Sequence, residues 1–404
     1  MTRIMFLGDL AGTGFGTVTK DLGGALLALG EDVRFVSQNE LGELPEPFAS
    51  RTYSVNDPNG WMAMRSAGMR GLLDGSLWPD GWTAEAAIIL GDYFAVREVV
   101  MATEDSRAAF ASIPVMHYIP VEGVDLPPTW KALWEIVQPV AMSEFGADQI
   151  ALVTGTRPPM VYHGVDTDQF RPLSGTKPLW IGGKALRSKA DCKRFFGGDP
   201  RARWLLRTDR HMPRKRYASM LRGIAPVLAS RPDVYMVMHC RSFDQGGNLP
   251  DTIAKYPTAL QRRMLITGFH DEVGGASRDV LVALYNAADV YLSTSAEGFG
   301  LTVAEAIACG TPAVGLDYSA VPEVIGPAGL LAPVAYLVDN EYDHAWAAVN
   351  EQAFGLAVAA LLDDDVLRKR LGRAGPEHVR TSFSWDRAAL AFAGIIADRV
   401  RAAA

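Results

Sequence analysis

Two glutamates, Glu297 and Glu305, stand eight residues apart in a setting that suits the binding of hydroxyl groups. A short apolar, β-branched run at 288–294 precedes them and predicts a buried strand. A helix is expected over 301–309, because a glycine and a proline follow it closely. Ionised carboxylates accept strong hydrogen bonds, and a sugar offers several hydroxyl donors. The pair is therefore a candidate sugar-binding site.

The turn between this strand and this helix carries two glycines, Gly298 and Gly300. Glycine lets backbone approach a ligand closely. The N-terminus of the following helix offers free N–H groups and a partial positive charge, which suits a phosphate. Hydroxyl-binding, phosphate-binding and again hydroxyl-binding groups thus follow one another, which is the layout of a nucleotide-sugar. An ordinary strand–turn–helix with surface carboxylates is the alternative.

This segment resembles the donor-site motif of the retaining glycosyltransferases of family 4, the group 1 glycosyl transferases. Members have two Rossmann-like α/β domains that face each other across a cleft, the GT-B architecture. The resemblance implies that Glu297 meets the transferred sugar, that backbone amides after the glycine bind the sugar and diphosphate, and that Glu305 holds the ribose. The donor-binding residues expected in the motif are Glu297, Gly298, Phe299, Gly300, Leu301, Thr302 and Glu305.

Two cations, Arg210 and Lys215, lie five residues apart after a strand expected at 202–208. Cations at such a loop suit a diphosphate. In the family, arginine and lysine at this spacing bind the donor diphosphate and stabilise it as it leaves. Asp209 and Arg216 stand where the family has glycines, which puts the loop geometry in doubt. Surface cations without a ligand are the alternative.

The first half begins with a βαβ unit whose glycine-rich loop follows the first strand, where open α/β sheets bind ligands. Its glycines match neither the dinucleotide fingerprint nor the phosphate-binding P-loop. No acidic residue ends the second strand at Ser37, which disfavours an NAD-dependent dehydrogenase. The resemblance implies that this loop faces the diphosphate or the acceptor, so Gly14 and Gly16 join the expected donor-binding residues, as does Phe269 in a strand expected at 264–270.

His117 is expected to follow a strand of the first half and lies near Glu122 in the sequence. Family members often place a histidine here to hydrogen-bond the transferred sugar, although a histidine at a strand end commonly has a structural role. A structural role is expected for His163. The expected catalytic residues are Glu297, His117, Arg210 and Lys215.

The fold class expected is α/β with two Rossmann-like domains. The resemblance assigns 1–172 to an N-terminal acceptor domain, 173–384 to a donor domain, and 385–404 to a helix that crosses back to the first domain. Helices are expected to fill 340–404. Residues 43–82, which include Trp61, Trp78 and Trp82, lie outside the resemblance. They predict either a loop-rich acceptor region or aromatic packing beneath long loops.

Composition narrows the class of protein. The chain has 404 residues, 49% apolar and 21% charged, which indicates two soluble domains. Its three cysteines lie far apart, and such unpaired cysteines fit the cytoplasm. Residues 2–8 predict a first strand and not a signal peptide. No apolar run approaches the roughly 20 residues of a membrane helix.

Charge is distributed unevenly along the chain. Residues 1–170 hold 10 Lys/Arg against 22 Asp/Glu, a net charge of −12, and the remainder holds 29 against 24, a net of +5. The acidic first half argues against docking on nucleic acid or an anionic membrane through that domain. Residues 184–222 form a basic cluster with 13 cations against three aspartates. This cluster leaves polyanion binding open.

No histidine, cysteine or carboxylate group has metal-site spacing. We therefore expect no metal. The resemblance implies no cofactor and a UDP- or GDP-sugar as co-substrate. The resemblance implies front-face attack by an acceptor hydroxyl with retention of configuration. Three alternatives stay open: a glycosyltransferase acting on a modified base in DNA, a catalytically inactive sugar-binding homologue, and a nucleotide-sugar 2-epimerase of the same architecture. The acceptor and the oligomeric state are not predicted.

Overall fold

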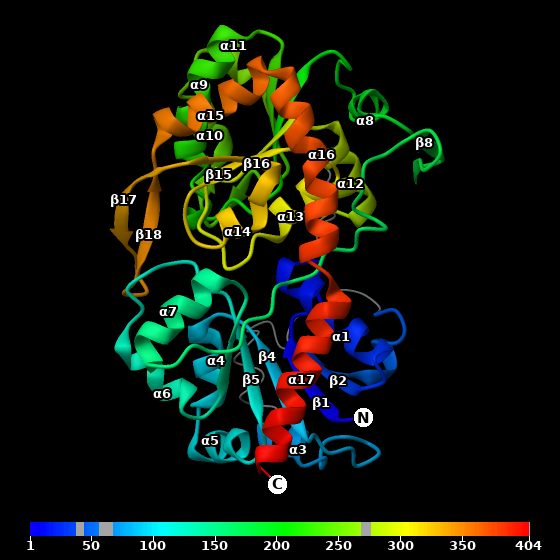
Figure 1. Ribbon diagram of the computed structural model, residues 1–404, viewed down its shortest axis with the longest axis vertical. Helices are drawn as coiled ribbons and strands as arrows, with labels where there is room; N and C mark the ends of the chain where they lie inside the picture. Colours follow the sequence, from blue (N-terminus) through cyan, green and yellow to red (C-terminus); the bar gives the residue numbers. More distant parts are fainter. Residues whose placement is uncertain (38–43, 56–67, 268–275, 404) are drawn as a thin grey trace. The chain divides into compact units, whose positions relative to one another are not determined.

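The computed structural model describes residues 1–37, 44–55, 68–267 and 276–403. The chain divides into two compact units (Figure 1). The first unit comprises Met1–Gly164 and Ser384–Ala404, and the second comprises Val165–Phe383.

The first unit is built on a six-stranded parallel sheet with the order β3-β2-β1-β4-β5-β6. Its strands are β1 (Arg3–Gly8), β2 (Asp32–Ser37), β3 (Thr52–Ser54), β4 (Ala86–Leu90), β5 (Val115–Ile119) and β6 (Gln138–Ala141). Its α-helices are α1 (Gly14–Ala28), α3 (Met69–Leu73), α4 (Tyr93–Val100), α5 (Glu104–Ala111), α6 (Lys131–Trp134), α7 (Glu144–Thr154) and α17 (Trp385–Ala403).

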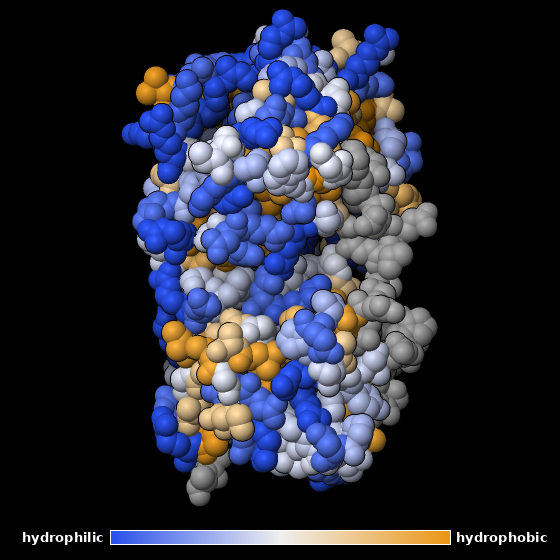
Figure 2. Space-filling model, turned by 90° about the vertical axis from the view of Figure 1, so that its right-hand side faces the viewer, coloured by the Kyte–Doolittle hydropathy of each residue, from blue (hydrophilic) through white to orange (hydrophobic). Residues whose placement is uncertain are grey.

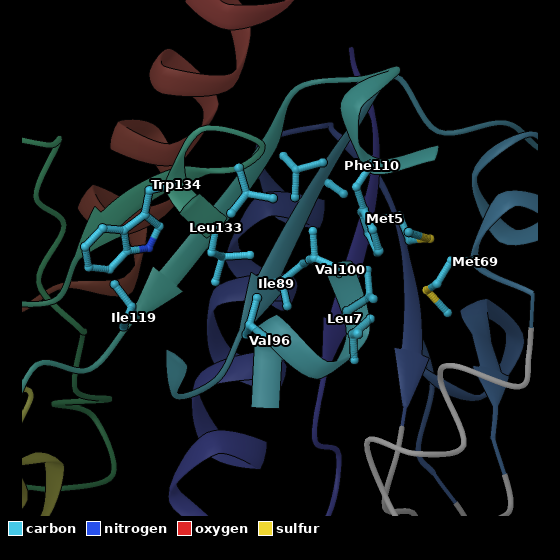
Figure 3. Packing of buried hydrophobic residues seen from close by; sticks show 14 of the residues in the cluster. Met5, Leu7, Met69, Ile89, Val96, Val100, Phe110, Ile119, Leu133 and Trp134 are labelled. Carbon is cyan, nitrogen blue, oxygen red and sulfur yellow. The ribbon is translucent and has the colours of Figure 1, made fainter. Parts of the chain in front are cut away.

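Side chains of β1 alternate between two apolar layers, as a parallel sheet covered on both faces requires. Met5 and Leu7 join a core with α3, α4, α5 and Trp134 on one face (Figure 3). On the other face Phe6 stacks on Phe35, with ring centroids 6.1 Å apart. There α17 packs against α1. The final helix is thus part of the first unit.

The second unit holds another six-stranded parallel sheet, with the order β13-β10-β9-β14-β15-β16. Its strands are β9 (Arg203–Arg207), β10 (Val234–Met238), β13 (Met264–Ile266), β14 (Val290–Leu292), β15 (Ala313–Leu316) and β16 (Gly329–Ala332). Its α-helices are α8 (Lys189–Phe195), α9 (Tyr217–Ser230), α10 (Leu249–Ile253), α11 (Thr258–Gln261), α12 (Arg278–Ala287), α13 (Leu301–Ala308), α14 (Val321–Ile325), α15 (Glu351–Asp363) and α16 (Asp365–Ser382).

Three antiparallel hairpins lie in the segments that connect the other elements of the second unit. They pair β7 (Leu179–Ile181) with β8 (Lys184–Leu186), β11 (Phe243–Asp244) with β12 (Gly247–Asn248), and β17 (Val334–Asp339) with β18 (Ala345–Val349). The third hairpin corrects the expectation that helices fill 340–404. Ala345, Ala347 and Val349 alternate on one strand face, and helix begins only at Glu351.

The first division between the units falls after Gly164, eight residues before the position expected at 172. Residues 165–172 lie with the second unit because their contacts run there. The Val165 amide donates to the Phe383 carbonyl at 3.1 Å, and the Phe170 ring lies 6.1 Å from that of Tyr285.

Two of the three tryptophans in residues 43–82, for which acceptor loops and packing beneath loops were both open, are packed. Trp78 and Trp82 are buried and meet edge to face, with ring centroids 5.5 Å apart. Their placement favours packing beneath loops; Trp61 lies outside the described residues. Within the described parts of the chain, no helix is both long enough and apolar enough to cross a membrane.

Candidate active site

The candidate site lies where β9 and β14 end side by side in the second sheet. These strands pair in parallel, with Leu206 opposite Tyr291. Their carboxyl ends therefore bring the residues after Arg207 next to the loop 293–300, at the sheet edge where α/β folds bind ligands. The predicted strand, turn and helix of the glutamate motif are all present.

The turn into α13 depends on Gly300. This residue has φ 105° and ψ 54° and directly precedes the helix, a conformation that side chains rarely adopt. The amide of Glu297 donates to the Ser319 hydroxyl at 2.9 Å, which fixes the start of the turn. Phe299 is buried and meets the Phe383 ring edge to face at 5.1 Å. The α13 N-terminus is thus held on both sides.

Lys215 and Glu297 form the centre of the site. The Lys215 ammonium lies 2.6 Å from Glu297 Oε1 and 3.1 Å from Asp209 Oδ1. All three side chains are buried. Burial opposes ionisation of Asp209, but Lys215 and Arg207 outweigh it and hold the pKa of the Asp209 carboxyl well below its usual value. The Asp209 carboxyl is therefore kept ionised at this position.

Arg207, at the end of β9, is fully buried beneath this pair. Its guanidinium donates from Nε to Asp209 Oδ2 at 3.1 Å and from Nη2 to Ser295 Oγ at 3.3 Å. It also hydrogen-bonds the Thr294 hydroxyl. Sequence reasoning missed this residue, although an arginine that ends the apolar run Trp204–Leu206 was a visible signal.

Three cations face two carboxylates in this cluster. Besides Arg207 and Lys215, Arg214 donates to Glu297 Oε2 at 3.5 Å and to the Ala296 carbonyl at 3.3 Å. The cluster therefore carries a surplus of positive charge next to the N-terminus of α13. Both features attract an anion. The arrangement suits the binding of a phosphate group, next to a carboxylate that can accept hydrogen bonds from hydroxyl groups.

Arg210 is directed elsewhere. Its guanidinium donates to both carboxylate oxygens of Asp244, at 3.1 and 2.8 Å, and its side chain is 56% exposed. The structure thus brings Lys215 to Glu297 but turns Arg210 toward the β11–β12 hairpin.

Glu305 lies on α13 and is buried. It accepts a hydrogen bond from the Tyr285 hydroxyl at 2.8 Å. The Thr302 hydroxyl, one turn earlier on the helix, lies 3.4 Å from Asp209 Oδ1. The motif helix is therefore connected to the loop after β9 by its first turn. Gly298 and Leu301 complete the motif beside them.

His117 lies inside β5 of the first unit, not after it, and is fully buried. Its Nε2 bonds the Gly91 carbonyl at 3.1 Å, and its Nδ1 accepts from Trp134 Nε1 at 3.3 Å. Burial lowers the pKa of His117 to about 4, against the effect of the Gly91 bond. With both ring nitrogens engaged by protein, this placement favours the structural role.

The other expected donor residues of the first unit belong to its glycine loop. Gly14 and Gly16 form the first turn of α1, where the Thr13 hydroxyl accepts from the Gly16 amide at 2.9 Å. A Cβ at Gly16 would lie 2.0 Å from the Ala11 carbonyl oxygen. Gly16 is thus required by the loop itself. Phe269 lies outside the described residues.

The basic cluster 184–222 is dispersed by folding. Its members pair with carboxylates on several elements: Lys193 with Asp289, Arg203 with Asp365, Arg210 with Asp244, and Arg222 with Glu351. Hydrophilic residues predominate over the second unit on the face shown in Figure 2. Pairing with carboxylates lowers the net positive charge that these four cations offer to a polyanion, which weakens the DNA alternative.

Two backbone conformations near the site give a stability prediction. Gly300→Ala is expected to lower the free energy of unfolding by about 1–2 kcal/mol, because φ 105° strains any side chain. Arg216→Gly is expected to leave it unchanged or raise it by up to about 1 kcal/mol, because Arg216 has φ 54°. Urea unfolding of the two variants measures the contrast. A stabilising Gly300→Ala would contradict it.

Residues 205–364 match the model of a family described as "Glycosyl transferases group 1". A D-inositol 3-phosphate glycosyltransferase of Corynebacterium glutamicum is 39% identical over 123 residues, which cover 30% of this chain and 26% of the relative. The first relatives are matched over only 26% to 53% of their own length.

Solved structures resemble the whole chain. A sucrose-phosphate synthase from Thermosynechococcus elongatus superposes with a TM-score of 0.71 at 17% identity, covering 100% of both chains. An Anabaena protein, HepE, in complex with UDP and glucose gives 0.70 at 13% identity, covering 98% of this chain and 100% of that one. These likenesses, with the two parallel sheets, confirm the predicted GT-B fold of two Rossmann-like domains.

Proposed function

We propose that the protein is a retaining glycosyltransferase, because residues 205–364 match the model of the group 1 glycosyl transferases. It moves a sugar from a nucleoside-diphosphate sugar to an acceptor hydroxyl. The observation that carries the proposal is the buried contact between Lys215 and Glu297, 2.6 Å apart, in a cationic cluster beside the turn into α13. This is the pair that the motif assigns to diphosphate and sugar.

The proposed chemistry is mainly electrostatic. Departure of the nucleoside diphosphate places negative charge on its phosphate oxygens. Lys215 and the first amides of α13 are positioned to stabilise that charge, and preorganised groups of this kind provide most of the rate enhancement in many enzymes. Arg210 would join them by leaving Asp244. Glu297 accepts hydrogen bonds from hydroxyl groups of the transferred sugar, and Glu305 is assigned to the ribose.

The donor is proposed to be a UDP- or GDP-sugar. HepE, which shares the fold, was solved with UDP and glucose, and this supports a uridine donor as the first choice. Cys192, Cys240 and Cys309 are buried and free. Reduced thiols fit the cytoplasm, where we propose that the protein acts.

A panel of UDP- and GDP-sugars tests the proposal by thermal shift and donor hydrolysis. A donor that binds the folded state raises the unfolding midpoint, by an amount that grows with its concentration over Kd. We expect one donor to stabilise the protein and to be hydrolysed slowly without acceptor. Failure of every donor to bind or react would refute the proposal.

Activity is expected to survive EDTA. Lys215, Arg214 and the α13 N-terminus can balance the charge of the leaving diphosphate, so no divalent cation is assigned a role. Turnover is measured with and without EDTA at matched ionic strength, because surface electrostatics vary with salt. Loss of turnover that Mg²⁺ or Mn²⁺ restores would contradict this assignment.

A further inference from the structure

We propose that Arg207 is a positioning residue of this site. Its guanidinium lies beneath Lys215 and Glu297 and fixes each of them through one intermediate side chain. The inference rests on the proposed function, because the two groups that it positions are those assigned to the donor.

The first connection runs through Asp209. Arg207 Nε donates to Asp209 Oδ2 at 3.1 Å, and the other carboxylate oxygen lies 3.1 Å from the Lys215 ammonium. The carboxylate is thus shared between two cations, one oxygen each. Without the guanidinium it could rotate and pair with Lys215 through both oxygens. The ammonium would then shift away from the phosphate position.

The second connection runs through Ser295. Arg207 donates to the Ser295 oxygen at 3.3 Å, and the Ser295 hydroxyl in turn donates to Glu297 Oε1. A serine hydroxyl has one proton. Because the guanidinium occupies an acceptor position of this oxygen, the proton is directed to Glu297. The carboxylate therefore keeps one orientation toward the sugar.

The guanidinium itself is held from several sides. Its Cζ lies 4.6 Å from the centroid of the Tyr217 ring, and it bonds the Thr294 hydroxyl. Taking an arginine out of water is costly, and replacing buried ion pairs by apolar residues is often neutral or stabilising. Stability alone does not account for Arg207 at the end of an apolar strand. Its hydrogen bonds to Asp209 and Ser295, which orient Lys215 and Glu297, do account for it.

The test compares Arg207→Met with Lys193→Met. Lys193 is also buried, 2.8 Å from Asp289, and has no place in the proposed site. Both variants remove one cation of a buried pair. Affinity for UDP and GDP is measured by calorimetry, donor hydrolysis gives kcat and KM, and the unfolding midpoint records stability.

Arg207→Met is expected to lower kcat by about 10- to 100-fold, because small displacements of positioned groups have effects of this size. Lys193→Met is expected to lower the midpoint and leave kcat and nucleotide affinity near those of the wild type. Arg207→Lys is expected to recover only part of the loss, since an ammonium lacks the guanidinium fork.

If Arg207→Met does not fold, Ser295→Ala decides the question. It removes the hydroxyl between Arg207 and Glu297, and we expect kcat to fall several-fold, with KM for the donor less affected. Wild-type kcat in either folded variant would overturn the proposal while leaving the proposed function intact. A wild-type protein that binds neither UDP nor GDP and hydrolyses no donor would refute both.

Discussion

Glu297→Ala and Lys215→Ala are each expected to lose at least about 100-fold in turnover, because each removes a group aimed at charge or hydroxyls in the transition state. The two side chains are in contact at 2.6 Å, so their effects are not expected to add. The double variant should be little slower than either single one. Donor hydrolysis and transfer rates measure this directly.

Both residues are buried. Each alanine variant therefore leaves a buried charge with fewer partners, which destabilises a protein by about 1–3 kcal/mol. Glu297→Gln and Lys215→Met keep the shape and separate lost chemistry from lost packing. Glu351→Ala, which breaks an exposed pair with Arg222, is the matched control and should keep full activity. Near-wild-type turnover of Glu297→Gln and Lys215→Met would remove the site assignment.

Mild acid is expected to destabilise the first unit. Burial lowers the pKa of His117 to about 4 and that of His163 to about 3, against about 6.5 in an unfolded chain. The unfolded state therefore binds more protons between these values. The stabilisation is complete above pH 6.5 and is lost as the pH falls, by about 1.4 kcal/mol per pH unit for each histidine well below 6.5.

Hydrogen exchange at pH 7.5 and pH 5, corrected for intrinsic rates, follows this loss in each unit separately. We expect a larger decrease in protection for peptides of the first unit, where both histidines lie. His163→Gln keeps a side chain that can hydrogen-bond the Tyr118 hydroxyl, which lies 2.7 Å from Nδ1 of the histidine, and should show a smaller decrease. Equal pH dependence in wild type and variant would contradict the assignment.

The alternating strands and helices were predictable because apolar runs, glycines and prolines mark them locally. The motif around Glu297 was predictable for the same reason, since its strand, turn and helix are contiguous in sequence. The β17–β18 hairpin was not predictable, because its exposed strand β17 pairs within the hairpin and no sequence pattern outside the hairpin marks it as a strand. The partners of Arg210 were also hidden. Asp244 lies 34 residues away. The spacing of residues after β9 does not reveal that a hairpin following β10 folds next to them.

The loop after β9 shows how substitutions can fit together. Arg216 occupies the left-handed region that a glycine would enter most readily. Asp209 adds a carboxylate where the resemblance led us to expect none, and Arg207 neutralises it. The paired residues lie two positions apart, at the end of β9 and in the loop that follows it.

Because Lys215 and Glu297 already satisfy each other, the site resists partial occupants. Inorganic phosphate meets an ammonium that is already paired with a carboxylate 2.6 Å away, and a free sugar must compete with a cation for that carboxylate. A molecule that carries both a diphosphate and hydroxyls replaces the two halves of the pair at once. The contact would thus favour binding of an intact donor over binding of its separate phosphate or sugar.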